Sequence, residues 1–448
     1  MRNLTPPRLI ILSFLSVICL GTIVLSLPIA TNGPGRLPLI DSLFTATSAT
    51  CVTGLIVRDT GSYFSAFGRW VIFLLFQMGG LGIMTFSTLF AVMLGRKIGF
   101  RQTEIVHSTL NKQSIVGLKK LIIYIVGITF AIEITGALLL FARWSAVTDW
   151  SIIETAERAV FHSVSAFCNA GFALFRTSFE NFSADPYINL VMIVLIVLGG
   201  IGFVVKMDII GLFINKGAAR RISLQAKIAL FTSFLLIVLG AVAILFFEKE
   251  GVLKTLSWGE RLWGAFFQSV TARTAGFNTL SIGEFTTPSL LFLIFLMFIG
   301  ASPGSTGGGI KTCTFAILFV TVKNMLKNNK HVKMFDRTIP RQVVRESLVI
   351  FFLGFTWVFV FTIILVYLQA RFASGEVSLA RTMFEVVSAF GTVGLSTGIT
   401  ESLDSVSKLC LTATMFAGRI GPLTLALAVA FRGGRDTYRF PEENVMVG

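Results

Sequence analysis

The chain has 448 residues, of which 54% are hydrophobic and only 14% are charged, against roughly 25% charged residues in ordinary soluble domains. A soluble fold cannot remove so much apolar surface from water, so this composition indicates an integral membrane protein that lies in the lipid bilayer. The net charge of +15 is compatible with nucleic-acid binding, but the placement of the basic residues argues against it, and we expect no nucleic-acid partner.

Eight apolar stretches are long enough to span a bilayer, which takes about 20 residues each. They are residues 9–27, 70–94, 121–141, 187–205, 228–247, 289–310, 348–370 and 409–431. The flanks and loops on one side of these stretches hold 22 of the 38 Lys and Arg residues. Because basic loops remain in the cytoplasm, we expect a multi-pass protein of the cell membrane with both termini cytoplasmic. The first stretch is too long for the core of a signal peptide and lacks a cleavage site, so we expect it to be a span.

A short polar segment follows the first, third, fifth and seventh stretches, and the four segments match when they are aligned on one glycine. The glycines are Gly54, Gly171, Gly276 and Gly394, which lie 117, 105 and 118 residues apart. A phenylalanine stands ten residues before each glycine: Phe44, Phe161, Phe266 and Phe384. A serine stands six residues before three of them (Ser48, Ser165 and Ser388), whereas the third copy has Val270 there.

These fixed offsets predict an all-α membrane protein with four pseudo-symmetric repeats around one pore. Each repeat would consist of a transmembrane helix, a re-entrant pore loop and a second transmembrane helix, which makes eight transmembrane helices in all. The predicted boundaries are 1–94 for repeat 1, 95–213 for repeat 2, 214–322 for repeat 3 and 323–431 for repeat 4, with a cytoplasmic tail at 432–448.

The four re-entrant segments have the chemistry of a cation filter. Backbone that is not helical survives at membrane depth only where it is buried or lines a water-filled cavity, and a ring of carbonyls can replace the water of an ion. A glycine permits the unusual backbone angles that such a strand needs, and the C-terminal ends of the short helices favour a cation. The predicted K⁺ selectivity filter is Val52, Thr53, Gly54, Asn169, Ala170, Gly171, Thr274, Ala275, Gly276, Thr392, Val393 and Gly394. The alternative, helix packing, suits the glycines at 79–82 and 199–202 better than these four.

The sixth apolar stretch contains five glycines and one proline within ten residues, and such a sequence cannot remain helical. We expect a flexible plug below the filter, and we call residues 300–311 the gate loop. Its candidate residues are Gly300, Ser302, Gly304, Ser305, Thr306, Gly307, Gly308, Gly309 and Lys311. We expect the hydroxyls of Ser302, Ser305 and Thr306 to hold the closed state through hydrogen bonds to pore-lining groups such as Arg419. Lys311, at the cytoplasmic end, is expected to register the movement of a docked partner. The loop nearly matches a phosphate-binding P-loop, but Ile310 precedes the lysine and no strand precedes the loop.

Arg419 and Glu133 are charged residues within the apolar stretches. A charge at that depth is costly and should face the protein interior or water, so we expect Arg419 to face the pore as an electrostatic barrier. The alternative is an ion pair with Glu133 or Glu385. Glu133 is expected to be a structural partner rather than a transport carboxylate. The five cysteines and three histidines are scattered along the sequence, which indicates neither an enzyme active site nor a metal cluster.

The four re-entrant segments, the gate loop and the string AGRIGPL at 417–423 resemble the Trk/Ktr/HKT potassium transporters over essentially the whole chain, and the Ktr-type membrane subunit in particular. The resemblance implies K⁺ as the transported ion and Na⁺ as a possible activator or symported ion. It also implies a homodimer controlled by a separate cytosolic ring of nucleotide-binding subunits that carries the ATP or ADP, with no cofactor on this chain. Some plant relatives with serine at the first filter position prefer Na⁺, so Gly54 favours K⁺.

The expected function is therefore K⁺ uptake through a carbonyl-lined filter with an intramembrane gate. The main alternative is a secondary transporter that couples a small solute to a cation gradient at broken helices near the midplane. That alternative accounts for the gate loop but not for four matched re-entrant segments. A membrane enzyme would need clustered catalytic side chains, which the sequence does not offer.

Overall fold

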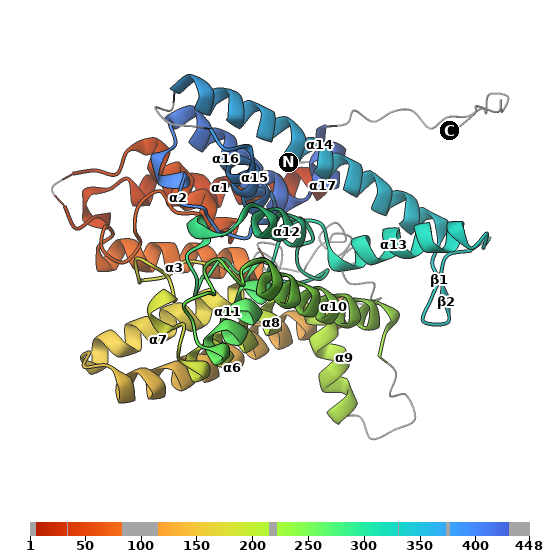
Figure 1. Ribbon diagram of the computed structural model, residues 1–448, viewed down its shortest axis with the longest axis horizontal. Helices are drawn as coiled ribbons and strands as arrows, with labels where there is room; N and C mark the ends of the chain where they lie inside the picture. The colour runs from red at the N-terminus through yellow and green to blue at the C-terminus, as the bar shows by residue number, and fades with distance from the viewer. Residues whose placement is uncertain are drawn as a thin grey trace.

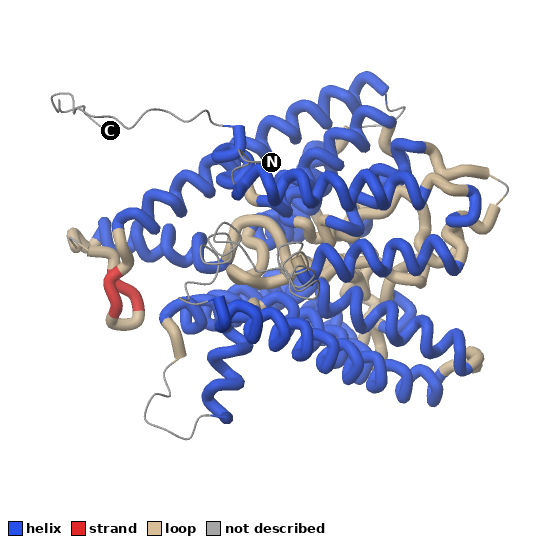
Figure 2. Tube along the Cα trace, turned by 180° about the vertical axis from the view of Figure 1, so that it is seen from behind, coloured by secondary structure: helices blue, strands red, loops and turns tan. Residues whose placement is uncertain are grey.

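The computed structural model describes residues 6–33, 35–82, 115–214, 222–329, 331–372 and 377–429. Figure 1 shows a bundle of helices joined by irregular segments. The described residues form a strand pair only in a small antiparallel hairpin, β1 (Lys333–Met334) with β2 (Arg337–Thr338), which projects from one edge of the bundle (Figures 1 and 2).

The helices of the bundle recur in a fixed order along the chain. The first of each set are α1 (Pro6–Leu25), α6 (Ile115–Val147), α10 (Leu224–Phe247) and α14 (Arg341–Phe372). Each is followed by a shorter helix, and these are α2 (Leu39–Thr50), α7 (Ile152–Cys168), α11 (Trp258–Thr271) and α15 (Leu379–Gly391). After each short helix come α3 (Ala66–Leu81), α8 (Pro186–Gly200) with α9 (Phe203–Ile214), α12 (Thr287–Phe298) with α13 (Thr312–Leu326), and α16 (Ser405–Ile420) with α17 (Pro422–Val429).

Three helices in the described part of the chain are both long and apolar enough to cross a bilayer: Ile123–Val147, Leu224–Phe247 and Arg341–Arg371. In the most apolar 18 residues of each helix, only 28%, 44% and 22% are buried within the protein. Most of their apolar surface therefore faces outward. Phe352, Phe355 and Phe359 of α14 are more than half exposed, for example. Such a surface is stable in lipid and not in water.

The short helices are anchored in the apolar core by a phenylalanine. Phe44, Phe161 and Phe384 are at most 4% exposed. The third copy differs, because Phe267 is fully buried there while Phe266 is only partly buried. In the third copy the buried phenylalanine is therefore Phe267, which lies nine residues before Gly276 and is one residue closer to it than in the other copies.

The expectation of continuous helices at 187–205 and 409–431 is wrong. Helix α8 gives way to α9 at Gly202, whose φ is 85°, and α16 gives way to α17 at Gly421, whose φ is 91°. Gly82, with a φ of 76°, likewise caps the end of α3. Because these left-handed angles do not fit an α-helix, Gly202 and Gly421 interrupt their helices, and α3 ends before Gly82.

Helix packing does explain two other glycines in these elements. A Cβ on Gly79 would overlap the carbonyl oxygen of Thr50, and one on Gly199 would overlap that of Phe167. Both carbonyls belong to the last residues of short helices. The absence of a side chain thus allows α3 and α8 to approach the ends of α2 and α7 closely.

Candidate functional site

Four glycines from distant parts of the chain form one ring, which we call the glycine ring (Gly54, Gly171, Gly276 and Gly394). A Cβ built on Gly171 would lie 3.2 Å from the Cα of Gly54 and 3.1 Å from that of Gly276. A Cβ on Gly394 would lie 3.0 Å from the Cα of Gly54, and one on Gly276 would lie 3.2 Å from the Cα of Gly394. The ring therefore closes in chain order.

Each glycine also faces a backbone carbonyl of its neighbour. A Cβ on each would come into close contact with the carbonyl oxygen of the residue that precedes the next glycine in the ring, and these residues are Ala170, Ala275, Val393 and Thr53. No side chain fits at any of the four positions without moving the backbone. All eight of the predicted filter residues that are not glycine are fully buried, so the structure brings the twelve predicted filter residues together.

The backbone is left-handed at two positions of every segment. The residues two positions before the glycines have φ values of 57° at Val52, 59° at Asn169, 77° at Thr274 and 49° at Thr392, and the glycines have values from 70° to 91°. For a β-branched residue such as Val52 this conformation is a true outlier, with a cost on the order of 1–3 kcal/mol. When left-handed and right-handed backbone angles alternate along a strand, successive peptide groups turn toward the same side, as in backbone nests. Here the groups that face the neighbouring strand are carbonyls.

The serines six residues before the glycines hold the filter strands. The Ser48 hydroxyl donates to the carbonyl of Leu55 at 2.7 Å and accepts from the N–H of Gly54 at 3.1 Å. Ser165 donates to the carbonyl of Phe172 at 2.8 Å, and Ser388 accepts from the N–H of Gly394 at 3.1 Å. The recurring serine thus fixes the backbone on either side of the glycine.

A second set of polar side chains, which the sequence comparison missed, holds the chain just beyond the glycines. His162 Nε2 accepts from the N–H of Leu174 at 3.1 Å, and Glu385 accepts from the N–H of Thr397 at 2.8 Å. Glu385 also accepts from the hydroxyls of Ser396, Thr397 and Thr400. Leu174 and Thr397 each lie three residues after a glycine.

The Gln268 amide is the counterpart of these groups in the third copy. With its oxygen turned toward the loop, it lies 3.2 Å from the N–H of Thr279 and 3.1 Å from that of Leu280. Because three different residue types perform this task, the four-way alignment gives no signal for it.

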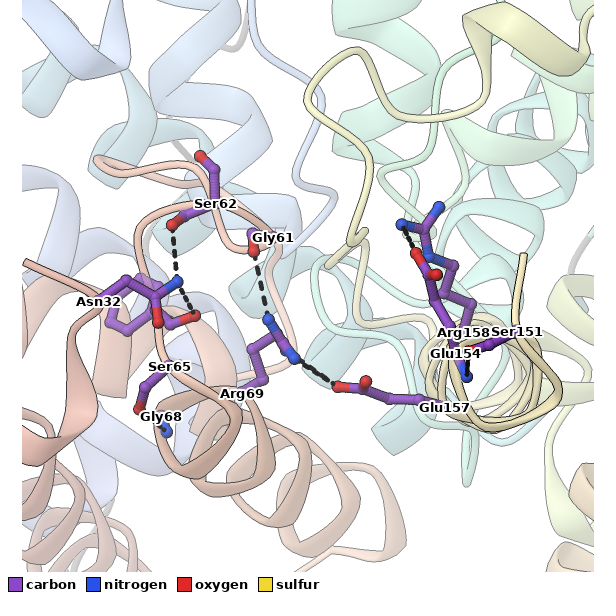
Figure 3. Close-up of polar contacts among 11 residues, drawn as sticks. Asn32, Gly61, Ser62, Ser65, Gly68, Arg69, Ser151, Glu154, Glu157 and Arg158 are labelled. Atoms are coloured by element: carbon purple, nitrogen blue, oxygen red, sulfur yellow. Dashed lines mark hydrogen bonds and ion pairs between the residues drawn. The ribbon is translucent and has the colours of Figure 1, made fainter. Parts of the chain in front are cut away.

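Four polar contacts link successive parts of the chain, and we call them the rim contacts. They are Arg69 with Glu157 (2.9 Å), Asn278 with Glu180 (2.7 Å), Arg381 with the carbonyl of Gly283 (3.1 Å) and Lys408 with Asp41 (2.7 Å). Figure 3 shows Arg69 reaching Glu157 on α7 and the carbonyl of Gly61. Burial and the nearby Glu284 carboxylate raise the pKa of Glu180, whereas the hydrogen bond from Asn278 acts to lower it. The rim contacts join each predicted repeat to the next, and the last of them returns to the first repeat.

The gate loop lies directly against the glycine-ring segments. The N–H of Gly308 donates to the hydroxyl of Thr392 at 3.0 Å, and the N–H of Gly309 donates to the carbonyl of Gly418 at 3.3 Å. On its other side, Ser302 N–H donates to the carbonyl of Gly200, and the carbonyl of Gly304 accepts from the N–H of Phe203. The loop is thus bound to α8, α9, the filter strand after α15, and α16.

Arg419 contacts the backbone of the gate loop. Its guanidinium donates to the backbone carbonyl of Thr306 and to that of Gly79 in α3. The loop hydroxyls have other partners, since Ser305 donates within the loop to the Ser302 carbonyl at 2.6 Å and the Thr306 hydroxyl donates to the carbonyl of Phe167 at 3.4 Å.

The two carboxylates considered as partners of Arg419 are engaged elsewhere. Glu133 is buried and accepts from the Gln77 amide at 3.0 and 3.1 Å, with the Cys168 thiol 3.8 Å away. Glu385 holds the loop after Gly394, as described above. Among the described residues Arg419 makes no ion pair, which removes the ion-pair alternative for that part of the chain.

Two lysines also lie around the gate loop. The ammonium group of Lys311 turns back and donates to the carbonyls of Gly307 at 2.6 Å and Gly308 at 3.4 Å. Lys206, which the sequence analysis missed because it follows an apolar stretch, is 5% exposed. Its ammonium lies 4.4 Å from the ring centre of Phe167 and 4.3 Å from that of Phe203.

The outward-facing apolar helices define a multi-pass membrane protein, and comparison with known proteins gives its family. The family "TrkH: Cation transport protein" matches residues 10–436. The chain is 37% identical to "Ktr system potassium uptake protein B" of Bacillus subtilis (strain 168), over 99% of this chain and 97% of that protein. It is 38% identical to the protein of the same name from Vibrio alginolyticus, over 99% of this chain and 95% of that protein.

A solved structure has the same fold. The potassium transporter TrkH from Vibrio parahaemolyticus superposes with a TM-score of 0.69 at 20% identity, over 93% of this chain and 84% of that chain. The chain therefore belongs to the TrkH family of cation transport proteins. This confirms the resemblance seen in the sequence, and it confirms that the chain is a transporter and not an enzyme.

Proposed function

We propose that this protein takes up K⁺ across the cell membrane through the glycine ring. The observation that carries the proposal is the closed ring itself, in which each glycine faces the carbonyl oxygen that precedes the next. Fixed carbonyls can replace the hydration shell of K⁺. The family membership and the names of the relatives support the choice of ion.

The proposed architecture consists of four repeats at 1–94, 95–213, 214–322 and 323–431, with eight membrane spans and both termini in the cytoplasm. In it, the short helices are pore helices whose C-terminal dipole ends face the pathway. The twelve residues of the four segments form the K⁺ filter. The gate loop closes the pathway below the filter, and Arg419 adds a positive barrier to cations beside it.

The proposal extends to partners. As the sequence resemblance implies, the working unit is a homodimer that docks onto a cytosolic ring of nucleotide-binding subunits, and Na⁺ acts as an activator or as a coupled ion. ATP or ADP belongs to the separate ring, and this chain supplies the ion pathway. A secondary transporter for a small solute is the alternative, and it would not require four carbonyl-facing glycines.

Replacing ring glycines tests the proposal. Gly54→Ser and Gly394→Ser should each weaken the apparent affinity for K⁺ by about tenfold or more, because a side chain in the left-handed region costs roughly 1–2 kcal/mol and overlaps a neighbouring carbonyl. The measurement is the K⁺ concentration dependence of uptake in a bacterium that lacks its own K⁺ uptake systems, together with Na⁺ permeation.

Gly259→Ser is the matched control, since this α11 glycine is exposed and a Cβ there meets no atom within 4 Å. It should behave like the parent protein. Unchanged K⁺ affinity and ion preference in both ring variants would mean that the ring is not the filter.

A further inference from the structure

Two basic side chains rest on three successive carbonyls of the gate loop. The carbonyl of Thr306 accepts from Arg419, and the carbonyls of Gly307 and Gly308 accept from the ammonium of Lys311. Among the described residues, these oxygens thus receive their hydrogen bonds from cations. A backbone stretch whose oxygens converge on positive groups is arranged as a cation site.

The same three residues lie next to the filter strands. A Cβ on Gly307 would overlap the hydroxyl of Thr274, and the N–H of Gly308 donates to the hydroxyl of Thr392. Thr274 and Thr392 each stand two residues before a ring glycine. The oxygens that bind Lys311 therefore lie beside the entrance to the glycine-ring segments rather than at a remote surface.

We propose that the carbonyls of Thr306, Gly307 and Gly308 form a second binding site for a monovalent cation, which Lys311 and Arg419 occupy as tethered cations in the arrangement seen here. This inference rests on the proposed function, because it places the site along the K⁺ pathway. A lysine ammonium is a compact point charge with three donors and no acceptor, so it satisfies the same oxygens that would bind K⁺. A K⁺ ion and the Lys311 ammonium on the same oxygens would repel each other, so only one of them can occupy the site at a time.

The exclusion gives the gate a chemical basis. While Lys311 lies on the Gly307 and Gly308 carbonyls, the loop has no place for a permeating ion. When the ammonium moves away, the vacated oxygens bind a dehydrated cation of K⁺ size. Opening then exchanges a tethered cation for a mobile one, and the local charge is unchanged.

Thallium diffraction tests the site, since Tl⁺ replaces K⁺ and is located by anomalous scattering. Crystals of the full chain with Lys311→Met, soaked in Tl⁺, should show an anomalous peak in contact with the Gly307 and Gly308 carbonyl oxygens. The parent and Lys311→Arg should show none there at the same concentration. Lys323→Met, an exposed position on α13, is the control and should behave like the parent.

Peaks at the glycine ring separate the two proposals. A ring peak in every protein without a loop peak in Lys311→Met overturns the second site and leaves the filter intact. The absence of ring peaks in all proteins overturns the proposed function. Should Lys311→Met fail to fold, Lys311→Gln removes the charge while it keeps a polar group, and the same soak applies to it.

Discussion

Single polar side chains behind the glycine ring determine its geometry. The four segments hold left-handed residues such as Val52 and Thr274 in a costly conformation, and this persists only where the surroundings over-determine it. The serine hydroxyls fix the strand at the glycine, while His162 and Glu385 fix the chain three residues later. The ring is therefore held by side chains outside it, since the glycines have no side chains of their own.

Glu385 is the most heavily bonded of these residues, which gives a prediction at this scale. Glu385→Ala should reduce the preference for K⁺ over Na⁺, because it leaves the buried N–H of Thr397 without its acceptor, at a cost of roughly 1–3 kcal/mol. Glu385→Gln should have a smaller effect, since its amide oxygen still accepts. The measurement is inhibition of K⁺ uptake by Na⁺. Equal selectivity in the parent and in Glu385→Ala would show that the bonds beyond the glycine do not tune the ring.

The residues of the ring and the recurring serines are visible in the sequence, but the groups that hold the chain beyond the glycines are not. A glycine at a fixed offset is the only residue that fits beside a neighbouring carbonyl, so the pattern is visible in one chain. These groups are His162, Gln268 and Glu385. They accept the same kind of backbone hydrogen bond, but they are three different residue types. The one-residue difference in the third copy is not visible in the sequence, because Phe266 stands at the ten-residue offset directly before the buried Phe267.

At the scale of elements, the main feature is that the helices after three of the short helices are interrupted, between α8 and α9, between α12 and α13, and between α16 and α17. The composition of residues 300–309 predicts a break, because glycine and proline are poor helix formers. The breaks at Gly202 and Gly421 carry a weaker signal, since a glycine in an apolar stretch equally suits helix packing. Only the structure shows that the gate loop bonds to the break between α8 and α9, through the carbonyl of Gly200 and the N–H of Phe203.

The gate loop bonds to its neighbours mainly through its backbone, so its length should matter more than its side chains. Deleting residues 303–307 should raise the rate of K⁺ or Rb⁺ uptake, because the loop can no longer reach α8, α9 and Arg419 at once. Replacing the same five residues with five Gly and Ser residues should leave uptake near the parent rate. Both variants are measured by Rb⁺ flux in proteoliposomes, after gel filtration has shown folded protein. If the deletion keeps the parent rate, the gate lies elsewhere.

At the scale of the whole molecule, the chain closes on itself. Helix α16 packs against α2, so the last described helices lie beside the first, and the glycine ring closes between Gly394 and Gly54. The four rim contacts follow the same circular order. Because all four predicted repeats belong to one chain, the junction between the last and the first has no covalent link nearby and depends on non-covalent contacts alone.

That junction gives the last prediction. Asp41 is bound by Lys408 at 2.7 Å and by Arg58 at 3.4 Å, and the side chains of Asp41 and Lys408 are only 6% and 12% exposed. Asp41→Asn should lower the midpoint of thermal unfolding in detergent more than Glu157→Gln does. Breaking a buried pair costs up to about 3–5 kcal/mol, whereas pairs near the surface contribute about 0–1 kcal/mol, and the Arg69–Glu157 side chains are 21% and 26% exposed.

The exposed Glu401 provides the control, and Glu401→Gln should leave the midpoint unchanged. Adding Lys408→Met to Asp41→Asn should cost little more than Asp41→Asn alone, because the two residues act on one contact. Since α2 leads directly into Gly54, the loss of this contact should also weaken K⁺ affinity, which Glu157→Gln should affect less. Equal midpoints for Asp41→Asn and Glu157→Gln would mean that closure between α16 and α2 rests on apolar packing, and the rim contact would then have no special part in it.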